Sequence, residues 1–403
     1  MTDHTPPTEA QFAESRALFV KGVEHFESGR LEPACICFEK CQALTPGRVS
    51  VLRNLGVSLF LLKRWDEAIP VLRQATAIDA ALADAWACLG LANEARRDWQ
   101  AAAEALKKAV ALTPQQAPLW LTLGQVCLRL GDAKNALQAF DRALEEDPSS
   151  APAWSDRGNL LRELQQFEEA ARCYEKAIAL GGDPGLNRYY LASVRGGDKP
   201  LTPPRRYVET LFDDYATDFQ SHAVETLRYR GYEVLLRPLL DRARRYQHVL
   251  DLGCGTGLCG QLIAPRAETV DGVDVSSAML AEARKLGIYR ELIHGDLAEV
   301  LAATPSRFDL ILAADVFIYV GDLAPIFRAV RRILEPEGCF AFTVELAKSG
   351  EDIQLLPSLR YAHSEAYVRG LADEAGLSVV NVFEAPIRHD QTTPIMGLYF
   401  YLT

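Results

Sequence analysis

The chain has 403 residues, of which 49% are hydrophobic, and its formal net charge is −11 at pH 7. This length allows two or three domains with packed cores of their own. Proteins that bind nucleic acid present a basic face to the phosphates, and this acidic chain shows no long basic run, so we expect no nucleic-acid partner. No secretory signal opens the chain and no run of 18 apolar residues occurs, so we expect no membrane partner and a cytoplasmic location.

The nine cysteines lack the spacing of a secreted disulfide framework, so we expect them to be reduced. Cys35, Cys37 and Cys41 lie close together and could suggest a metal site. No second pair of ligands follows them, and Cys41 falls on a small-residue position of the repeat described next. We therefore predict no metal site.

A repeat of about 34 residues runs through the first half of the chain. Glycine recurs at positions 22, 56, 90, 124 and 158, and alanine recurs at positions 34, 68, 102, 136 and 170. Large side chains recur four residues after each alanine, at Phe38, Leu72, Leu106, Phe140 and Tyr174. This pattern resembles that of tetratricopeptide repeats.

The resemblance implies helix pairs at 15–48, 49–82, 83–116, 117–150 and 151–184, after a flexible segment 1–14. Such pairs stack into a right-handed solenoid with a concave groove. The first helix of each pair faces the groove, at positions that include Arg53, Asn54, Val57, Leu121, Thr122, Gln125, Ser155, Asp156, Asn159 and Arg162. This mixture of side chains favours a protein or peptide substrate in the groove. The alternative is that the repeats form a homodimer.

Residues 185–206 are interpreted as a capping helix and a linker. A helix is expected over residues 185–195, and the Gly- and Pro-rich segment 196–204 ends it, which predicts a domain boundary there. Residues 207–403 then form the second domain.

The second domain is organised around residues 249–257, which read Val-Leu-Asp-Leu-Gly-Cys-Gly-Thr-Gly. A buried strand ends at Leu250, Asp251 follows at its carboxyl end, and three glycines form a tight turn before a helix that starts at Leu258. A strand, a glycine turn and a helix N-terminus together predict a nucleotide-type site. A dinucleotide-binding turn would place a glycine where Leu258 stands, so that class is disfavoured.

This turn resembles the first motif of class I S-adenosylmethionine-dependent methyltransferases, in which the acidic residue and the glycines hold the methionine end of the cofactor. Asp274 ends the next predicted strand, 270–275, where a carboxylate accepts the ribose hydroxyls. Asp296 matches the family position that accepts a hydrogen bond from the adenine amino group. The cofactor implied is S-adenosyl-L-methionine, with S-adenosyl-L-homocysteine as product. The cofactor-binding residues predicted in this way are Tyr215, Asp251, Gly253, Cys254, Gly255, Gly257, Asp274, Val275, Met279, Asp296, Leu297 and Asp315.

Strands and helices alternate through the rest of this domain. Strands are expected at 308–314 and 339–345 around a helix at 323–334, and two last strands are expected at 377–385 and 396–402. The alternation predicts a doubly wound, mostly parallel sheet. The fold class expected is an all-α solenoid followed by a Rossmann-like, seven-stranded class I methyltransferase domain.

Residues 207–245 precede the first strand, and Phe212, Tyr215, Phe219 and His222 recur there at helical spacing. The segment resembles the helical lid of methyltransferases that are fused to tetratricopeptide repeats, although Gln220 replaces a family aspartate. The alternative is an amphipathic helix that packs on the edge of the sheet.

Methyl transfer is an in-line displacement, and an acceptor that carries a proton also needs a base. The candidates for catalytic residues are Tyr319 and Asp315 after the fourth strand, His363, and His222 in the lid. Three functions remain open. The first is methylation of a protein or peptide, the second is methylation of a small molecule or natural-product intermediate with repeats that assemble subunits, and the third is a scaffold that binds the cofactor without turnover.

Overall fold

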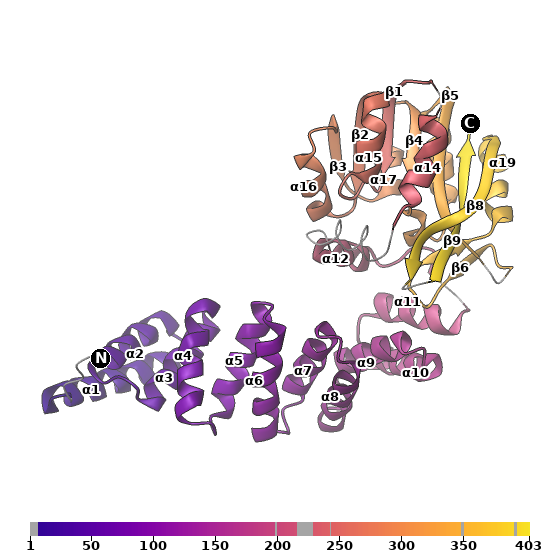
Figure 1. Cartoon of the computed structure of the whole chain (residues 1–403). Helices are drawn as coiled ribbons and strands as arrows, with labels where there is room; N and C mark the ends of the chain where they lie inside the picture. Colours follow the sequence, from indigo (N-terminus) through magenta and orange to yellow (C-terminus); the bar gives the residue numbers. More distant parts are fainter. Residues whose placement is uncertain (1–6, 198–199, 216–228, 242, 348–349, 391–392) are drawn as a thin grey trace. The chain divides into compact units, whose positions relative to one another are not determined.

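The computed structural model describes residues 7–197, 200–215, 229–241, 243–347, 350–390 and 393–403. Contacts divide the chain into two compact units, Met1–Gly182 and Asp183–Thr403 (Figure 1). The sequence places the boundary at 196–204, but helix α11 (Pro184–Arg195) belongs to the second unit. Tyr189 in α11 donates a hydrogen bond to the Leu359 carbonyl oxygen (2.6 Å), and its ring lies 6.2 Å from that of Tyr361.

The first unit is a run of antiparallel helix pairs, as the repeat pattern predicts (Figure 1). The helices are α1 (Glu9–Glu27), α2 (Leu31–Leu44), α3 (Val49–Leu61), α4 (Trp65–Ile78), α5 (Ala83–Ala95), α6 (Trp99–Leu112), α7 (Ala117–Arg129), α8 (Ala133–Glu146), α9 (Ala151–Glu163) and α10 (Phe167–Ala179). Helix α1 begins inside the segment 1–14 that the sequence predicts to be flexible. The reason is a capping box, in which Thr8 Oγ1 accepts a hydrogen bond from Gln11 N and the Gln11 side chain accepts one from Thr8 N.

The glycine that recurs in each repeat has a direct packing cause. A Cβ atom placed on Gly124 would lie 2.4 Å from the Phe140 ring, so only glycine lets the two helices of the pair approach this closely. The same contact recurs in every repeat, in the pairs Gly22–Phe38, Gly56–Leu72, Gly90–Leu106 and Gly158–Tyr174. Each repeated glycine is therefore matched to the large side chain sixteen residues later.

Substitution of Gly124 tests this packing. Gly124→Ala should lower the free energy of unfolding of the repeat unit by about 1–3 kcal/mol, since the added methyl group forces Phe140 or the backbone to move. Urea unfolding followed by circular dichroism measures the change, with the exposed Lys134→Ala as a control that should stay within about 0.5 kcal/mol of wild type. Equal stability of both variants would contradict the packing argument.

The second unit is built on one nine-stranded sheet. Its order runs β3 (Glu291–His294), β2 (Ala267–Asp274), β1 (Tyr246–Leu252), β4 (Phe308–Ala313) and β5 (Leu334–Leu346), all paired in parallel. Strand β9 (Thr393–Leu402) is antiparallel to both β5 and β8 (Val379–Asp390). These seven strands confirm the predicted Rossmann-like fold. The sequence did not predict the short hairpin of β6 (Ile353–Leu355) and β7 (Tyr361–His363), in which β7 also pairs with β5.

Helices cover both faces of this sheet (Figure 1). Leu310 and Leu312 of β4 share a core with α14 (Gly231–Leu240) and α15 (Leu258–Ile263), whereas Ile311 and Ala313 share one with α17 (Leu297–Ala303), α18 (Ala324–Ile333) and α19 (Glu365–Ala375). Three further elements are α12 (Arg205–Tyr215), α16 (Ser277–Lys285) and the short helix η3 (Phe317–Tyr319). No helix among the described residues is long and apolar enough to cross a membrane.

Candidate functional site

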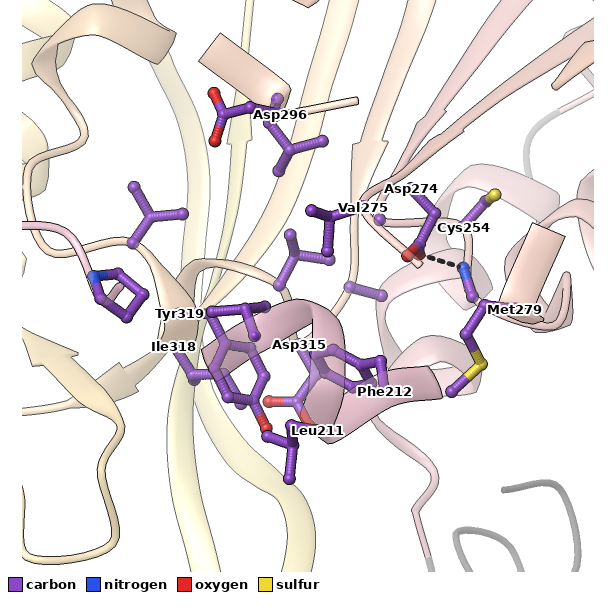
Figure 2. A pocket seen from close by; sticks show the side chains of 18 of the residues that line it. Leu211, Phe212, Cys254, Asp274, Val275, Met279, Asp296, Asp315, Ile318 and Tyr319 are labelled. Atoms are coloured by element: carbon purple, nitrogen blue, oxygen red, sulfur yellow. Dashed lines mark hydrogen bonds between the residues drawn. The ribbon is translucent and has the colours of Figure 1, made fainter. Parts of the chain in front are cut away.

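A cavity of about 790 Å³ opens where β1, β2 and β4 end, the edge at which open α/β sheets bind ligands. Side chains from α12 and from the ends of these strands surround it (Figure 2). The structure brings ten of the predicted site residues together in its lining: Gly253, Cys254, Gly255, Asp274, Val275, Met279, Asp296, Leu297, Asp315 and Tyr319.

The Asp274 carboxylate is fixed at the tip of β2. One oxygen accepts a hydrogen bond from Gly255 N (2.8 Å) and the other accepts one from Ser276 N (2.9 Å). Burial raises the pKa of Asp274, and the two backbone donors oppose that rise. Asp274 thus lines the cavity with a carboxylate that two backbone N–H groups hold in place.

The glycine turn beside Asp274 is shaped to let a ligand approach the backbone. Gly255 has φ +54°, and no atom lies within 4 Å of the position that its Cβ would take. Gly253 has φ +61°, and a Cβ there would lie 2.5 Å from Val316. Both positions therefore favour glycine, the first for its backbone conformation and the second also for space. Gly255 lines the cavity, and the space next to its Cα atom is open.

Asp251 lies behind this turn and does not line the cavity. It is 1% exposed, and the Tyr289 hydroxyl donates a hydrogen bond to its Oδ2 atom (2.8 Å). Burial raises the pKa of Asp251 to about 7. The structure thus shows Asp251 bonded to Tyr289 and outside the cavity lining. Gly257, also outside the lining, is the N-cap of α15 with φ +98°.

Asp296 has two roles that are compatible. Its Oδ1 atom caps α17 by accepting hydrogen bonds from Ala298 N (2.9 Å) and Glu299 N (3.2 Å). Asp296 also lines the cavity, at some distance from Asp274 in Figure 2. A carboxylate has more than two acceptor sites, so the cap leaves room for a ligand donor.

Asp315 sits at the end of β4 in a left-handed conformation, with φ +58°. Its N–H donates to Thr343 Oγ1 (2.8 Å), and its Oδ1 atom accepts from Arg388 Nη1 (2.5 Å). Arg388 is 4% exposed and also donates to Glu345 Oε2. Because a buried guanidinium needs carboxylate partners, Asp315 is held by Arg388.

Helix α12 closes one side of the cavity, as Figure 2 shows for Leu211 and Phe212. The Phe212 ring meets the Tyr319 ring edge-on, with centroids 5.1 Å apart. Asp213 Oδ1 accepts a hydrogen bond from Ser276 Oγ (2.6 Å), which ties α12 to the residue that caps α16. Tyr215 ends α12, but its side chain and all of His222 lie outside the described residues.

Removal of the Asp213 contact should loosen this side of the cavity. Asp213→Ala deletes one hydrogen bond to Ser276, worth about 1 kcal/mol, so S-adenosylhomocysteine should dissociate about five times faster. Stopped-flow displacement measures the rate, and Thr210→Ala on the exposed side of α12 is the matched control. If both variants release the ligand at the wild-type rate, the Asp213–Ser276 contact does not retain it.

His363 lies outside the cavity lining and is fully buried in β7. Its Nε2 atom lies 2.9 Å from the Gly321 carbonyl oxygen, to which it donates. Burial lowers the pKa of His363 to about 4. The histidine is therefore neutral and structural, and the interpretation of His363 as a base for the acceptor does not fit this geometry.

Comparison with known families agrees with both units. Residues 249–338 match a family of methyltransferase domains, and residues 15–48, 88–151 and 151–181 match families of tetratricopeptide repeats. The chain joins tetratricopeptide repeats to a class I methyltransferase domain.

The relatives of the methyltransferase domain carry O-methyltransferase names. The malonyl-acyl-carrier protein O-methyltransferase of Legionella pneumophila is 34% identical over 172 residues, which are 40% of this chain and 60% of that protein. A ubiquinone biosynthesis O-methyltransferase of Pseudomonas syringae is 34% identical over 102 residues, which are 24% of this chain and 43% of that protein. The chain thus spans less than two thirds of either relative. The MamA crystal structure covers 41% of this chain and 91% of its own, at 24% identity and a TM-score of 0.39.

Several residues that line the cavity of the methyltransferase domain carry no motif in the sequence. They come from the segment before α12 and its first residue, from the start of α14 and the residues before it, from the turn between β6 and β7, and from β8: Leu201, Thr202, Pro203, Arg205, Tyr229, Tyr232, Arg360 and Arg388. Their positions depend on long-range contacts, such as the Leu201 carbonyl oxygen accepting from Asp322 N (3.0 Å). A spacing rule along the chain does not detect such contacts.

Proposed function

We propose that the chain transfers the methyl group of S-adenosylmethionine to a protein or peptide acceptor that the repeat unit recruits. The observation that carries this proposal is the Asp274 carboxylate, which is bonded to the glycine turn at Gly255 and faces a large cavity. The match of residues 249–338 to methyltransferase domains supports the same cofactor.

The described residues fit S-adenosylmethionine. Asp274 would accept the ribose hydroxyls, Asp296 would accept from the adenine amino group, and the open backbone at Gly255 would lie against the methionine portion. When bound, the cofactor supplies a methyl group on a sulfonium, which is ready for in-line displacement. Asp251, which the sequence assigns to the methionine end, would act through the turn that directly follows it in the chain.

The protein itself contributes orientation and exclusion of water. Helix α12 covers the cavity through Phe212 and is tied down through Asp213. Tyr319, in η3 after β4 and with its ring against Phe212, would contact the acceptor. Asp315 would shape this end of the cavity through its ion pair with Arg388.

Contacts between successive repeats support a continuous groove surface in the first unit. Gln125 in α7 donates to Asp156 in α9 (2.8 Å), and Arg53 in α3 forms an ion pair with Asp84 in α5. These bonds link the first helices of neighbouring pairs, which are the helices that the repeat pattern assigns to the groove. A groove of this kind binds an extended chain by contacts remote from the reacting atoms, and such contacts can orient the acceptor.

The double variant Gln125→Ala/Asp156→Ala tests recruitment. It removes two polar groove side chains that an extended acceptor would contact, so methylation of the acceptor should fall by about ten-fold at low acceptor concentration, from the loss of about 1–2 kcal/mol of binding. The readout is tritium transferred from S-adenosylmethionine to proteins of a cell lysate. Arg142→Ala/Glu145→Ala, which removes an exposed ion pair of α8, is the control. The affinity for S-adenosylhomocysteine should equal that of wild type in the groove variant and in the control variant.

A second candidate is methylation of a small molecule, with the repeats assembling subunits. The names of the relatives favour it, because they refer to a malonyl thioester carrier and to ubiquinone biosynthesis. Label that appears only in small molecules, and that the groove variant does not change, would favour this candidate over the first.

A further inference from the structure

Tyr289 contacts the glycine turn of residues 253–257 without lining the cavity. It lies just before β3, where the backbone is fixed because Arg290 N donates to the Val270 carbonyl oxygen of β2 (2.7 Å). The Tyr289 hydroxyl reaches across β2 to the end of β1, where it donates to Asp251 Oδ2 (2.8 Å). One side chain therefore joins the segment before β3 to the strand that leads into the turn.

Three glycines leave the space that the Tyr289 side chain occupies. A Cβ atom on Gly272 in β2 would lie 3.0 Å from the Tyr289 ring, and one on Gly257 would lie 3.3 Å from it. A Cβ atom on Gly260 in α15 would overlap the Tyr289 hydroxyl. Side chains at these positions would displace the tyrosine, so β2, the glycine turn and α15 are all matched to it.

The glycine turn needs contacts that fix it, because glycine adopts many backbone conformations at little cost. The three glycines of the turn have positive φ values, from +54° to +98°. At the cavity, Gly255 N is bonded to the Asp274 carboxylate. Outside the cavity lining, Tyr289 packs against Gly257 and bonds to Asp251, the residue from which the chain enters the turn. The turn is thus held at both of its ends.

The Tyr289 hydroxyl keeps its proton in this environment. Burial raises the pKa of Tyr289, and the neighbouring Asp251 raises it further. A protonated phenol can donate to a carboxylate and also to the carbonyl oxygen of a neutral carboxyl group. The bond between Tyr289 and Asp251 therefore does not require a particular charge on Asp251.

We propose that Tyr289 is a positioning residue for the cofactor, one that holds the glycine turn in its binding conformation before the ligand arrives; this rests on the function proposed above. Tyr289 acts through the turn, since it does not line the cavity itself. A turn that is already fixed loses less conformational entropy when the ligand binds. If the turn occupied its binding conformation for only part of the time, the apparent affinity and the association rate would both fall by that fraction.

Tyr289→Phe keeps the ring and removes only the hydroxyl. Calorimetry on the full chain should show that S-adenosylhomocysteine binds about five-fold more weakly, which is the effect of one lost hydrogen bond. Stopped-flow mixing should show this change in the association rate, with a dissociation rate within about two-fold of wild type. Tyr401→Phe is the matched control, because the buried Tyr401 also donates to a backbone oxygen, that of Leu235 (2.8 Å). Its affinity should equal that of wild type.

A double-mutant cycle tests whether the hydroxyl acts through Asp251. In an Asp251→Leu background the Tyr289 hydroxyl has lost its acceptor, so Tyr289→Phe should no longer weaken the binding of S-adenosylhomocysteine. An equal loss of affinity in the wild-type and Asp251→Leu backgrounds would overturn the role of this bond.

Gly260→Ala tests the same tyrosine from α15. The added methyl group overlaps the Tyr289 hydroxyl, so binding of S-adenosylhomocysteine should weaken by about ten-fold. In a Tyr289→Leu background, which frees the space, Gly260→Ala should cause no further loss. Gly370→Ala in α19 is the matched control, because no atom lies within 4 Å of the position that its Cβ would take.

Wild type and Tyr289→Phe together separate the possible failures. If wild type does not bind S-adenosylhomocysteine, both the proposed function and this inference fail. If wild type binds it, and a Tyr289→Phe protein that is folded by circular dichroism binds equally well, only the role of Tyr289 is overturned. A loss of affinity that comes entirely from faster dissociation would also overturn it, because the turn would then be fixed without the tyrosine hydroxyl before the ligand arrives.

Discussion

Asp274→Ala should weaken the binding of S-adenosylhomocysteine by about 30- to 1000-fold. The variant removes a buried carboxylate that would accept the ribose hydroxyls, and a pair of charge-assisted hydrogen bonds is worth about 2–4 kcal/mol. It also leaves Gly255 N and Ser276 N without their acceptor, which loosens the turn. Titration calorimetry on the full-length variant measures the loss.

Asp373→Ala is the matched control, because Asp373 is an exposed aspartate of α19 in the same unit. Its affinity should equal that of wild type. An Asp274→Ala protein that is folded by circular dichroism and binds within three-fold of wild type would show that this carboxylate does not hold the ligand.

The second large effect concerns the dependence of stability on pH. Burial raises the pKa of Asp251 from its ordinary value of 3.8 to about 7, and the Tyr289 hydroxyl opposes this rise only in part. A group whose pKa is raised by folding stabilises the protein below its ordinary pKa, and this stability is lost as the pH rises through the folded-state value. Between pH 5 and pH 8, Asp251 should therefore lower the free energy of unfolding by about 3 kcal/mol.

Asp251→Asn isolates this contribution. The amide oxygen can still accept from Tyr289, but the side chain no longer ionises. The stability of the variant relative to wild type, measured by urea unfolding, should increase with pH over this range. A relative stability that stays constant from pH 5 to pH 8 would mean that Asp251 does not titrate there.

Much of the fold could be predicted because its causes are local or periodic. The glycines of the repeats are required by a large side chain at a fixed distance along the chain, as Gly124 and Phe140 show. The strands of the second unit end in residues that face one edge of the sheet, so Asp274 and Asp296 could be placed in one site from their positions alone.

The remaining features of the site depend on contacts between residues far apart in the sequence, which the spacing of motifs does not reveal. Asp251 carries the family motif, yet its carboxylate is bonded to Tyr289, which lies just before β3 and two helices further along the chain. Asp315 follows β4 as predicted, but its partner Arg388 comes from the long hairpin near the end of the chain. The turn that contains Leu359 and Arg360 accepts a hydrogen bond from Tyr189 of α11. The sequence assigns this helix to the end of the repeats. In each case the tertiary contact decides what the side chain can do.

Titration of the full-length protein with S-adenosylhomocysteine is the most direct test of the central claim that the cavity at Asp274 binds S-adenosylmethionine. The account predicts saturable binding of one ligand per chain, with S-adenosylmethionine competing for the same site. No binding of S-adenosylhomocysteine, or tighter binding of NAD than of S-adenosylhomocysteine, would contradict it.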